Sequence, residues 1–182
     1  MGSAEAPIRS DGGFTVIEVL LACLLITIGL LALAGAIETG FGVVMTAQED
    51  TIARQKAREA LESVLTGRNT ANISFSQIDN VGTGNGIFLT GFQPLYQPGA
   101  DGIIGTADDA AEGMETITLP GPDGILGTAD DIVQPLENYQ RKIEITDLSG
   151  TLKQIKVTIQ YTTPSNLARS VVMVCYVSPY IN

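Results

Sequence analysis

Residues 14–37 read FTVIEVLLACLLITIGLLALAGAI, an apolar stretch of 24 residues with a single charged side chain, Glu18. As an α-helix this stretch spans about 36 Å, which is enough to cross the roughly 30 Å hydrocarbon core of a membrane. A core helix of a soluble domain seldom contains an uncharged run as long as residues 19–37. A secretory signal has a shorter apolar run, and a small-residue cleavage site follows it. The stretch therefore predicts one membrane-spanning helix near the N-terminus.

Glu18 is the unusual residue of this stretch. A carboxylate inside hydrocarbon costs several kcal/mol unless it is paired, so an acidic residue at this place indicates a function. The alternative is that Glu18 lies at the membrane boundary, where water solvates its charge. Composition alone leaves both interpretations open.

The residues around Glu18 form a recognisable motif. The segment GFTVIEVL, residues 13–20, resembles the processing site of type IV prepilins and type II secretion pseudopilins, in which a glycine precedes FT(L/V)IEV and a long apolar helix. The resemblance implies that residues 1–13 are a leader peptide, that a prepilin peptidase cuts between Gly13 and Phe14, and that Phe14 becomes the N-methylated mature N-terminus. It also implies that Glu18 pairs with the terminal amine of a neighbouring subunit during assembly, which would give the buried charge a partner.

The same resemblance sets expectations for location and partners. The chain is expected in a bacterial inner membrane as a single-pass protein, with its head in the periplasm, and then in an extracytoplasmic fibre. The expected partners are other pilin or pseudopilin subunits, the prepilin peptidase, an inner-membrane assembly platform and membrane lipid.

Beyond the apolar run, residues 38–67 continue without proline and become amphipathic. Their apolar residues favour one helical face, and Gly67 is a natural helix stop. These residues predict that the membrane helix (14–37) continues as an amphipathic half (38–67) that packs under a globular head. The apolar positions are Phe41, Val44, Ala47, Ile52, Ala57, Ala60, Leu61, Val64 and Leu65.

The head comprises residues 68–182, and its C-terminal part (140–180) alternates apolar and polar residues. Residues 140–146, 152–162 and 170–177 are rich in β-branched side chains, which predicts three strands. The turn segments 147–150 and 163–166 separate them and predict an antiparallel meander packed on the helix. The predicted fold class is α+β, with a long N-terminal helix and a small C-terminal β-sheet head in a pilin-like layout.

An internal repeat occupies residues 99–131, between helix and meander. GADGIIGTADD (99–109) and GPDGILGTADD (121–131) agree at nine of eleven positions, and residues 99–131 contain eight acidic and no basic side chains. Calcium prefers six to eight oxygen ligands, so the repeats predict possible Ca²⁺ sites, with Thr106 and Thr128 nearby. The alternative is a pair of solvated Asp-Gly turns. The candidate ligands are Asp101, Asp108 and Asp109 in the first copy, and Asp123, Asp130 and Asp131 in the second.

Composition excludes several function classes. The chain has no histidine, a net charge of −10 and two cysteines. These features argue against His-dependent catalysis, nucleic-acid binding and a disulfide scaffold. Cys23 lies in the membrane helix and Cys175 in the last strand, so an internal disulfide is not expected. The chain is not expected to be an enzyme.

Two functions follow from these observations. The first is a minor pilin or pseudopilin, a structural subunit of a type IV pilus or type II secretion-like fibre. The second is a membrane-tethered calcium-binding or ligand-binding protein that does not polymerise.

Overall fold

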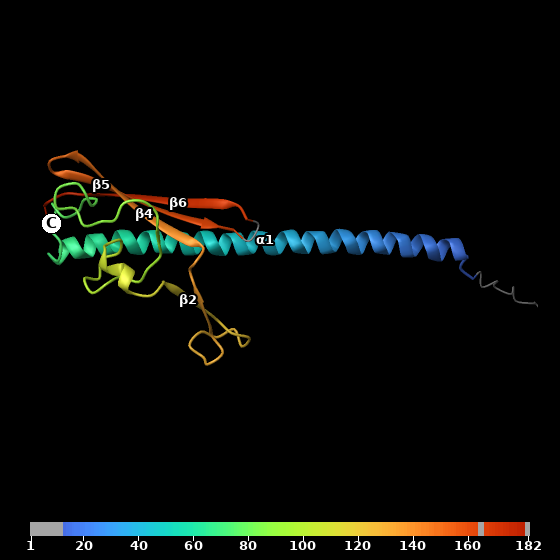
Figure 1. Ribbon diagram of the computed structural model, residues 1–182. Coiled ribbons are helices and arrows are strands. Elements are labelled where there is room, and N and C mark those ends of the chain that lie inside the picture. Colours follow the sequence, from blue (N-terminus) through green and yellow to red (C-terminus); the bar gives the residue numbers. More distant parts are fainter. Residues whose placement is uncertain (1–12, 164–165, 181–182) are drawn as a thin grey trace, which may run out of the picture. The chain divides into compact units, whose positions relative to one another are not determined.

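The computed structural model describes residues 13–163 and 166–180. One long helix, α1 (Val16–Asn69), precedes a four-stranded antiparallel sheet and a separate two-stranded sheet (Figure 1). The predicted α+β fold class, a long N-terminal helix with a small antiparallel sheet, is confirmed. The chain divides into two compact units, Met1–Val43 and Val44–Asn182, and each is described by itself. Of the predicted leader, only Gly13 lies within the described residues.

The N-terminal unit is the first half of α1. Val16 begins the helix directly after three non-helical residues, and from there to residue 37 the large apolar side chains are all exposed. Among the described residues, α1 is the one helix that is long and apolar enough to cross a membrane. Such a surface is compatible with insertion of this part of α1 into a membrane.

The second half of α1 presents a narrow face of small residues to the head. Its buried residues begin at Ala53, whereas Phe41 and Val44, which were expected on the packed face, are exposed. The buried set is Ala53, Ala57, Ala60, Leu61, Val64 and Gly67. Small side chains at helical spacing let the sheet and loops approach the helix backbone closely.

The helix does not stop at Gly67 as predicted but continues to Asn69. The chain leaves the helix through Ala71, which has a positive φ of 58°, and the Asn72 N–H donates to the Gly67 carbonyl oxygen at 2.9 Å. Gly67 instead serves packing, because a Cβ atom there would lie 3.1 Å from Ile103 Cδ1. A glycine that allows a side chain to approach the helix backbone closely thus looks, in the sequence, like a helix stop.

The main sheet contains the three predicted strands and one more. Its order is β1 (Gln93–Pro94), β4 (Tyr139–Ser149), β5 (Leu152–Thr162) and β6 (Ala168–Val177), and every pair is antiparallel. Strand β4 is longer than predicted. It runs through residues 147–149 with a register shift, which leaves a shorter turn before β5.

The core lies between the sheet and the second half of α1. Strand β5 is central and places Ile155, Val157, Ile159 and Tyr161 in the interior at alternate positions. Tyr161 stacks on Tyr139 of β4 with ring centroids 5.4 Å apart. This alternation is the period-2 pattern that predicted the strands.

A two-stranded antiparallel sheet interrupts the predicted acidic loop. Strands β2 (Thr116–Leu119) and β3 (Ile132–Pro135) pair over four residues, and the second repeat lies between them. In Figure 1 this hairpin projects away from α1.

Cys23 and Cys175 are free thiols, as predicted. Burial raises the pKa of the Cys175 thiol above its ordinary value. The thiol therefore packs as a small apolar group.

Candidate functional site

The predicted processing site lies immediately before α1. Gly13, Phe14 and Thr15 are non-helical and exposed, and Phe14 is 82% exposed. A Cβ atom at Gly13 would meet no neighbouring atom within 4 Å. The segment around the Gly13–Phe14 bond is therefore non-helical and uncovered.

Thr15 and Glu18 explain why the helix begins where it does. The backbone N–H of Glu18 donates to Thr15 Oγ1 at 3.4 Å and to the Thr15 carbonyl oxygen at 3.1 Å. The Thr-x-x-Glu spacing is that of a capping box, and the positive end of the helix dipole favours an acidic residue in the first turn. Glu18 is exposed, and within the described residues no cation forms an ion pair with it.

In the first repeat, the three predicted carboxylates organise the loop itself. Asp101 Oδ1 accepts the Ile103 N–H at 2.8 Å, and Asp108 Oδ1 accepts the Thr106 hydroxyl at 2.7 Å. Asp109 is buried and accepts two backbone N–H groups, from Gly99 at 3.0 Å and from Gly105 at 2.6 Å. Desolvation raises the pKa of the Asp109 carboxyl above its ordinary value, against the opposing effect of these two N–H groups.

The second repeat folds in the same way, 22 residues later. Asp123 Oδ1 accepts the Ile125 N–H at 2.8 Å, Asp130 Oδ1 accepts the Thr128 hydroxyl at 2.6 Å, and Asp131 Oδ2 accepts the Gly127 N–H at 2.6 Å. The matched distances agree closely with those of the first copy. Gly105 and Gly127 also have matching positive φ angles of 96° and 90°, which glycine adopts without strain.

The two copies differ in what surrounds them. In the first, Ile103 and Ile104 are only 1% and 7% exposed, whereas their counterparts Ile125 and Leu126 are each 61% exposed. The Thr106 hydroxyl is buried and the Thr128 hydroxyl is not. The loop conformation is therefore internal to the repeat, and its burial depends on the neighbouring elements.

The structure brings Asp101, Asp108 and Thr106 of the first copy together around one hydroxyl. The Thr106 Oγ1 atom is 2.7 Å from Asp108 and 3.5 Å from Asp101. In the described part of the chain, however, no group of three or more acidic, His or Cys side chains is arranged to hold a metal ion. Binding of calcium would therefore require these carboxylates to exchange hydrogen bonds for metal contacts, and calcium binding stays a prediction.

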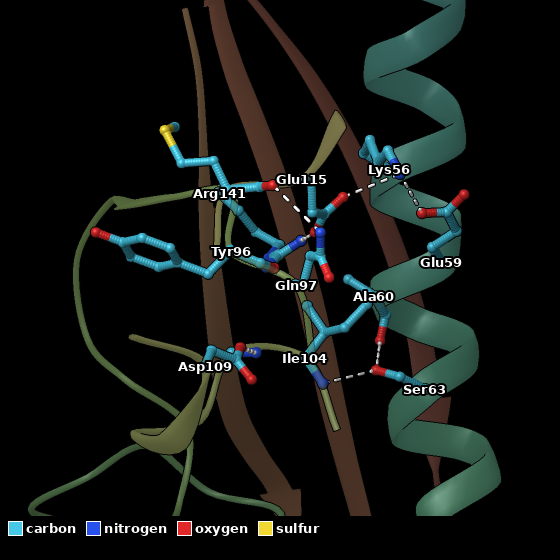
Figure 2. Close-up of polar contacts among 12 residues, drawn as sticks. Lys56, Glu59, Ala60, Ser63, Tyr96, Gln97, Ile104, Asp109, Glu115 and Arg141 are labelled. Atoms are coloured by element: carbon cyan, nitrogen blue, oxygen red, sulfur yellow. Dashed lines mark hydrogen bonds and ion pairs between the residues drawn. The ribbon is translucent and has the colours of Figure 1, made fainter. Parts of the chain in front are cut away.

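Sequence reasoning missed a buried ion-pair cluster between α1 and the sheet. Glu115 forms ion pairs with Lys56 Nζ at 2.9 Å and with Arg141 Nη1 at 2.8 Å (Figure 2). The side chains of Glu115 and Arg141 are only 6% and 4% exposed. Lys56 also pairs with Glu59 at 2.8 Å. Burial opposes the Lys56 charge, but these two carboxylates more than offset it and raise the pKa of the Lys56 ammonium.

One signal for this cluster was present in the sequence. Lys56 lies three residues after Ala53 and four before Ala60, so it shares their buried helical face. A lysine on a face of small residues indicates a buried anion opposite it. Nothing local identified Glu115 as that anion, because it lies 59 positions further along the chain.

No family model, curated protein or solved structure matches this chain. Function is therefore inferred from the residues and contacts described above.

Proposed function

We propose that this chain is a minor pilin or pseudopilin, a structural subunit that assembles from a membrane into a pilus-like fibre. The observation that carries the proposal is the position of the Gly13–Phe14 motif. It lies in an exposed non-helical segment, three residues before an uncovered apolar helix that carries Glu18 in its first turn. Cleavage at this bond would leave the helix and its charge at the start of the mature chain.

The apolar surface of α1 supports membrane insertion. Full burial of one large apolar side chain stabilises by about 1.5–3 kcal/mol relative to exposure in water. Many such side chains are exposed together between residues 16 and 37. Lipid first, and neighbouring helices after assembly, would cover this surface without any change in the fold.

The charge of Glu18 supports assembly rather than anchoring alone. A membrane anchor needs no carboxylate near its start, and an unpaired one is costly in hydrocarbon. Leader removal would create a cationic amine on Phe14. In an assembled fibre, the amine of a neighbouring chain would give the Glu18 charge a partner.

The location and partners follow from this proposal. The leader stays on the cytoplasmic side, where the prepilin peptidase acts, and the head lies in the periplasm. An inner-membrane assembly platform and other pilin subunits are the protein partners. The chain acts without catalysis of its own.

The experiment replaces Glu18 with Ala and, as a matched control, with Gln, in cells that contain the assembly system. The Glu18→Ala chain is expected to be inserted and cleaved but lost from sheared fibres. Glu18→Gln retains the size and hydrogen-bonding capacity of the side chain without its charge, so an equal loss assigns the effect to charge. Unchanged incorporation of Glu18→Ala would contradict the proposal.

The same experiment separates the second function, a tethered calcium-binding or ligand-binding head that does not polymerise. A tether requires α1 in the membrane but no subunit contact. It therefore predicts that the wild-type chain stays in the membrane fraction and never appears in sheared fibres.

A further inference from the structure

The two copies of the repeat have one conformation but opposite surroundings. We infer that the second copy is a docking element, and that its tip, Ile125 and Leu126, packs on the outer face of strand β6 in a second copy of this chain. The inference deepens the proposed fibre function and rests on it for the setting in which two chains meet.

The first copy shows how this module docks. Its apolar pair, Ile103 and Ile104, packs against the C-terminal part of α1. Ile103 lies against Gly67, and the Ile104 N–H donates to Ser63 Oγ at 3.2 Å (Figure 2). The module is thus a preformed loop that presents two adjacent aliphatic side chains to a surface of this same chain.

The second copy presents the equivalent pair to solvent. Ile125 and Leu126 are each 61% exposed in a hairpin whose strand β3 also exposes Ile132 and Val133. The Ile125 and Gly127 N–H groups donate to Asp123 and Asp131, as their counterparts do in the first copy. The first copy also has a bond from the Gly99 N–H to Asp109. A loop already fixed in its conformation loses little entropy when it binds.

The β6 outer face is the matching surface. Val172, Val174 and Tyr176 alternate with the core residues of β6 and are exposed. Strand β6 is also the last strand of the sheet, so within the described residues its free edge has no partner strand. A contiguous apolar group on an end strand is a surface that proteins usually cover.

Charge makes these two surfaces complementary. Residues 120–137, around the tip, contain four acidic and no basic side chains. On the outer face of the sheet, Lys156 pairs in register with Val174 of β6, and Lys142 lies one strand further on. Glu144 forms ion pairs with both lysines, so these three residues together carry one net positive charge. Opposite charges at the rim favour this orientation over tip-to-tip contact.

The contact joins two different surfaces, so it is heterologous and can repeat from chain to chain. A heterologous contact that does not close into a ring generates a filament. The tip is small compared with a stable interface of about 800 Å² per partner. We therefore expect the contact to form when α1 already holds the chains together in a membrane or fibre.

Disulfide cross-linking of the full-length chain in membranes tests the inference. The background carries Cys23→Ser and Cys175→Ala, which removes both native thiols. Leu126→Cys and Val174→Cys are placed on separate, differently tagged chains and oxidised. We expect a two-tag dimer at least five-fold above the pair that uses Val81→Cys, another exposed apolar residue of the head, in place of Leu126→Cys. Raising salt should lower the yield, because exposed charges are screened.

A charge variant provides the second measurement. Leu126→Asp replaces an exposed aliphatic side chain with a charged one, so the melting temperature of the chain should not change. Cross-linking of a nearby Ile125→Cys to Val174→Cys should fall several-fold. The inference is overturned if the two-tag dimer does not exceed the Val81 control, if the Leu126→Cys chain cross-links only to itself, or if the only product joins the chain to a different protein.

Failure of this head contact and failure of the proposed function give different results. Loss of incorporation in Glu18→Ala together with no Leu126–Val174 cross-link overturns the head contact and leaves the fibre proposal standing. A specific cross-link together with unchanged incorporation of Glu18→Ala supports the head contact and contradicts the role proposed for Glu18.

Discussion

Replacement of Glu115 with Gln tests the buried cluster that joins α1 to the head. The substitution preserves side-chain shape and removes the negative charge that Lys56 and Arg141 share. Both cations then stay buried without this anion. Arg141 keeps a 3.3 Å hydrogen bond to the Tyr96 carbonyl oxygen, and Lys56 keeps its pair with Glu59.

The expected loss of stability is large. Removal of one partner from a buried ion pair typically costs about 3–5 kcal/mol, because an uncompensated charge stays in a medium of low dielectric. The unit Val44–Asn182 has an unfolding entropy near 0.3 kcal/mol/K at about 2.1 cal/mol/K per residue. Division of the two quantities gives a melting temperature lower by roughly 10–17 °C.

Thermal unfolding of the full-length chain in detergent, followed by near-ultraviolet circular dichroism, measures this shift. The tyrosines in the core, Tyr139 and Tyr161, report tertiary packing of the head. Glu59→Gln is the matched control. It removes the other carboxylate bound to Lys56, but that side chain is 37% exposed, so its pair contributes at most about 1 kcal/mol.

Two results would refute the reasoning. One is a Glu115→Gln melting temperature within 3 °C of that of wild type, because an uncompensated buried charge should lower the stability by more than this shift represents. The other comes from the double variant Glu115→Met with Arg141→Met, which removes the anion and one cation together. It should melt above Glu115→Gln, and a lower value would show that shape, not charge, determines stability here.

Three further predictions concern processing, calcium and alkaline pH. Mass analysis of membrane-extracted protein should find a mature chain that begins at a methylated Phe14. Calcium in 100-fold excess over its dissociation constant should stabilise the chain by about 2.7 kcal/mol, with weak sites of roughly 0.1–1 mM, and Asp101→Asn and Asp123→Asn should each remove one site. Desolvation raises the pKa of Tyr139 and of Tyr161. The fold therefore favours the neutral forms of these side chains, and this contribution to stability is fully present below about pH 10. It is lost as pH rises through the folded-state pKa values.

Each of these has a contradicting result. An intact leader in cells that contain the peptidase would contradict processing at Phe14. If several millimolar calcium does not change the melting temperature, and the Asn variants are as stable as wild type, the repeats are turns held by their own hydrogen bonds. Magnesium is the control ion, because it needs a smaller and more regular oxygen cage. Urea unfolding between pH 9 and 11.5 should show a shallower decline for Tyr139→Phe, and an unchanged slope would contradict the pH prediction.

Sequence alone determined the elements that depend on long local patterns. The uncharged run before residue 37 predicted a membrane-length helix, and alternation of β-branched residues predicted β4, β5 and β6 close to their observed bounds. These patterns are strong because many successive residues give the same signal. In the strands, apolar side chains recur on one face of the sheet, and in the helix almost every side chain is apolar. Several hydrogen bonds inside each repeat are similarly local, because the bonded residues lie two to four positions apart.

The short strands form because of the backbone segments that lie beside them, and not because of a local sequence pattern. Strand β1 has two residues and includes a proline, and β2 and β3 have four residues each, too few for alternation to indicate a strand. They pair because β4 and the packing of the loop place complementary backbone beside them. Gly67 illustrates the same limit, since its close approach to Ile103 is visible only once the loop has folded back on α1.

Tertiary structure alone decided which charges and which aliphatic side chains are buried. Lys56, Glu115 and Arg141 come from three distant parts of the chain, and no local pattern links them. Two nearly identical repeats form the same loop, yet Ile103 is buried and Ile125 is exposed. Local hydrogen bonds fix the shape of a segment of this kind, but removal of its side chains from water requires a surface that only the rest of the fold, or another molecule, can provide.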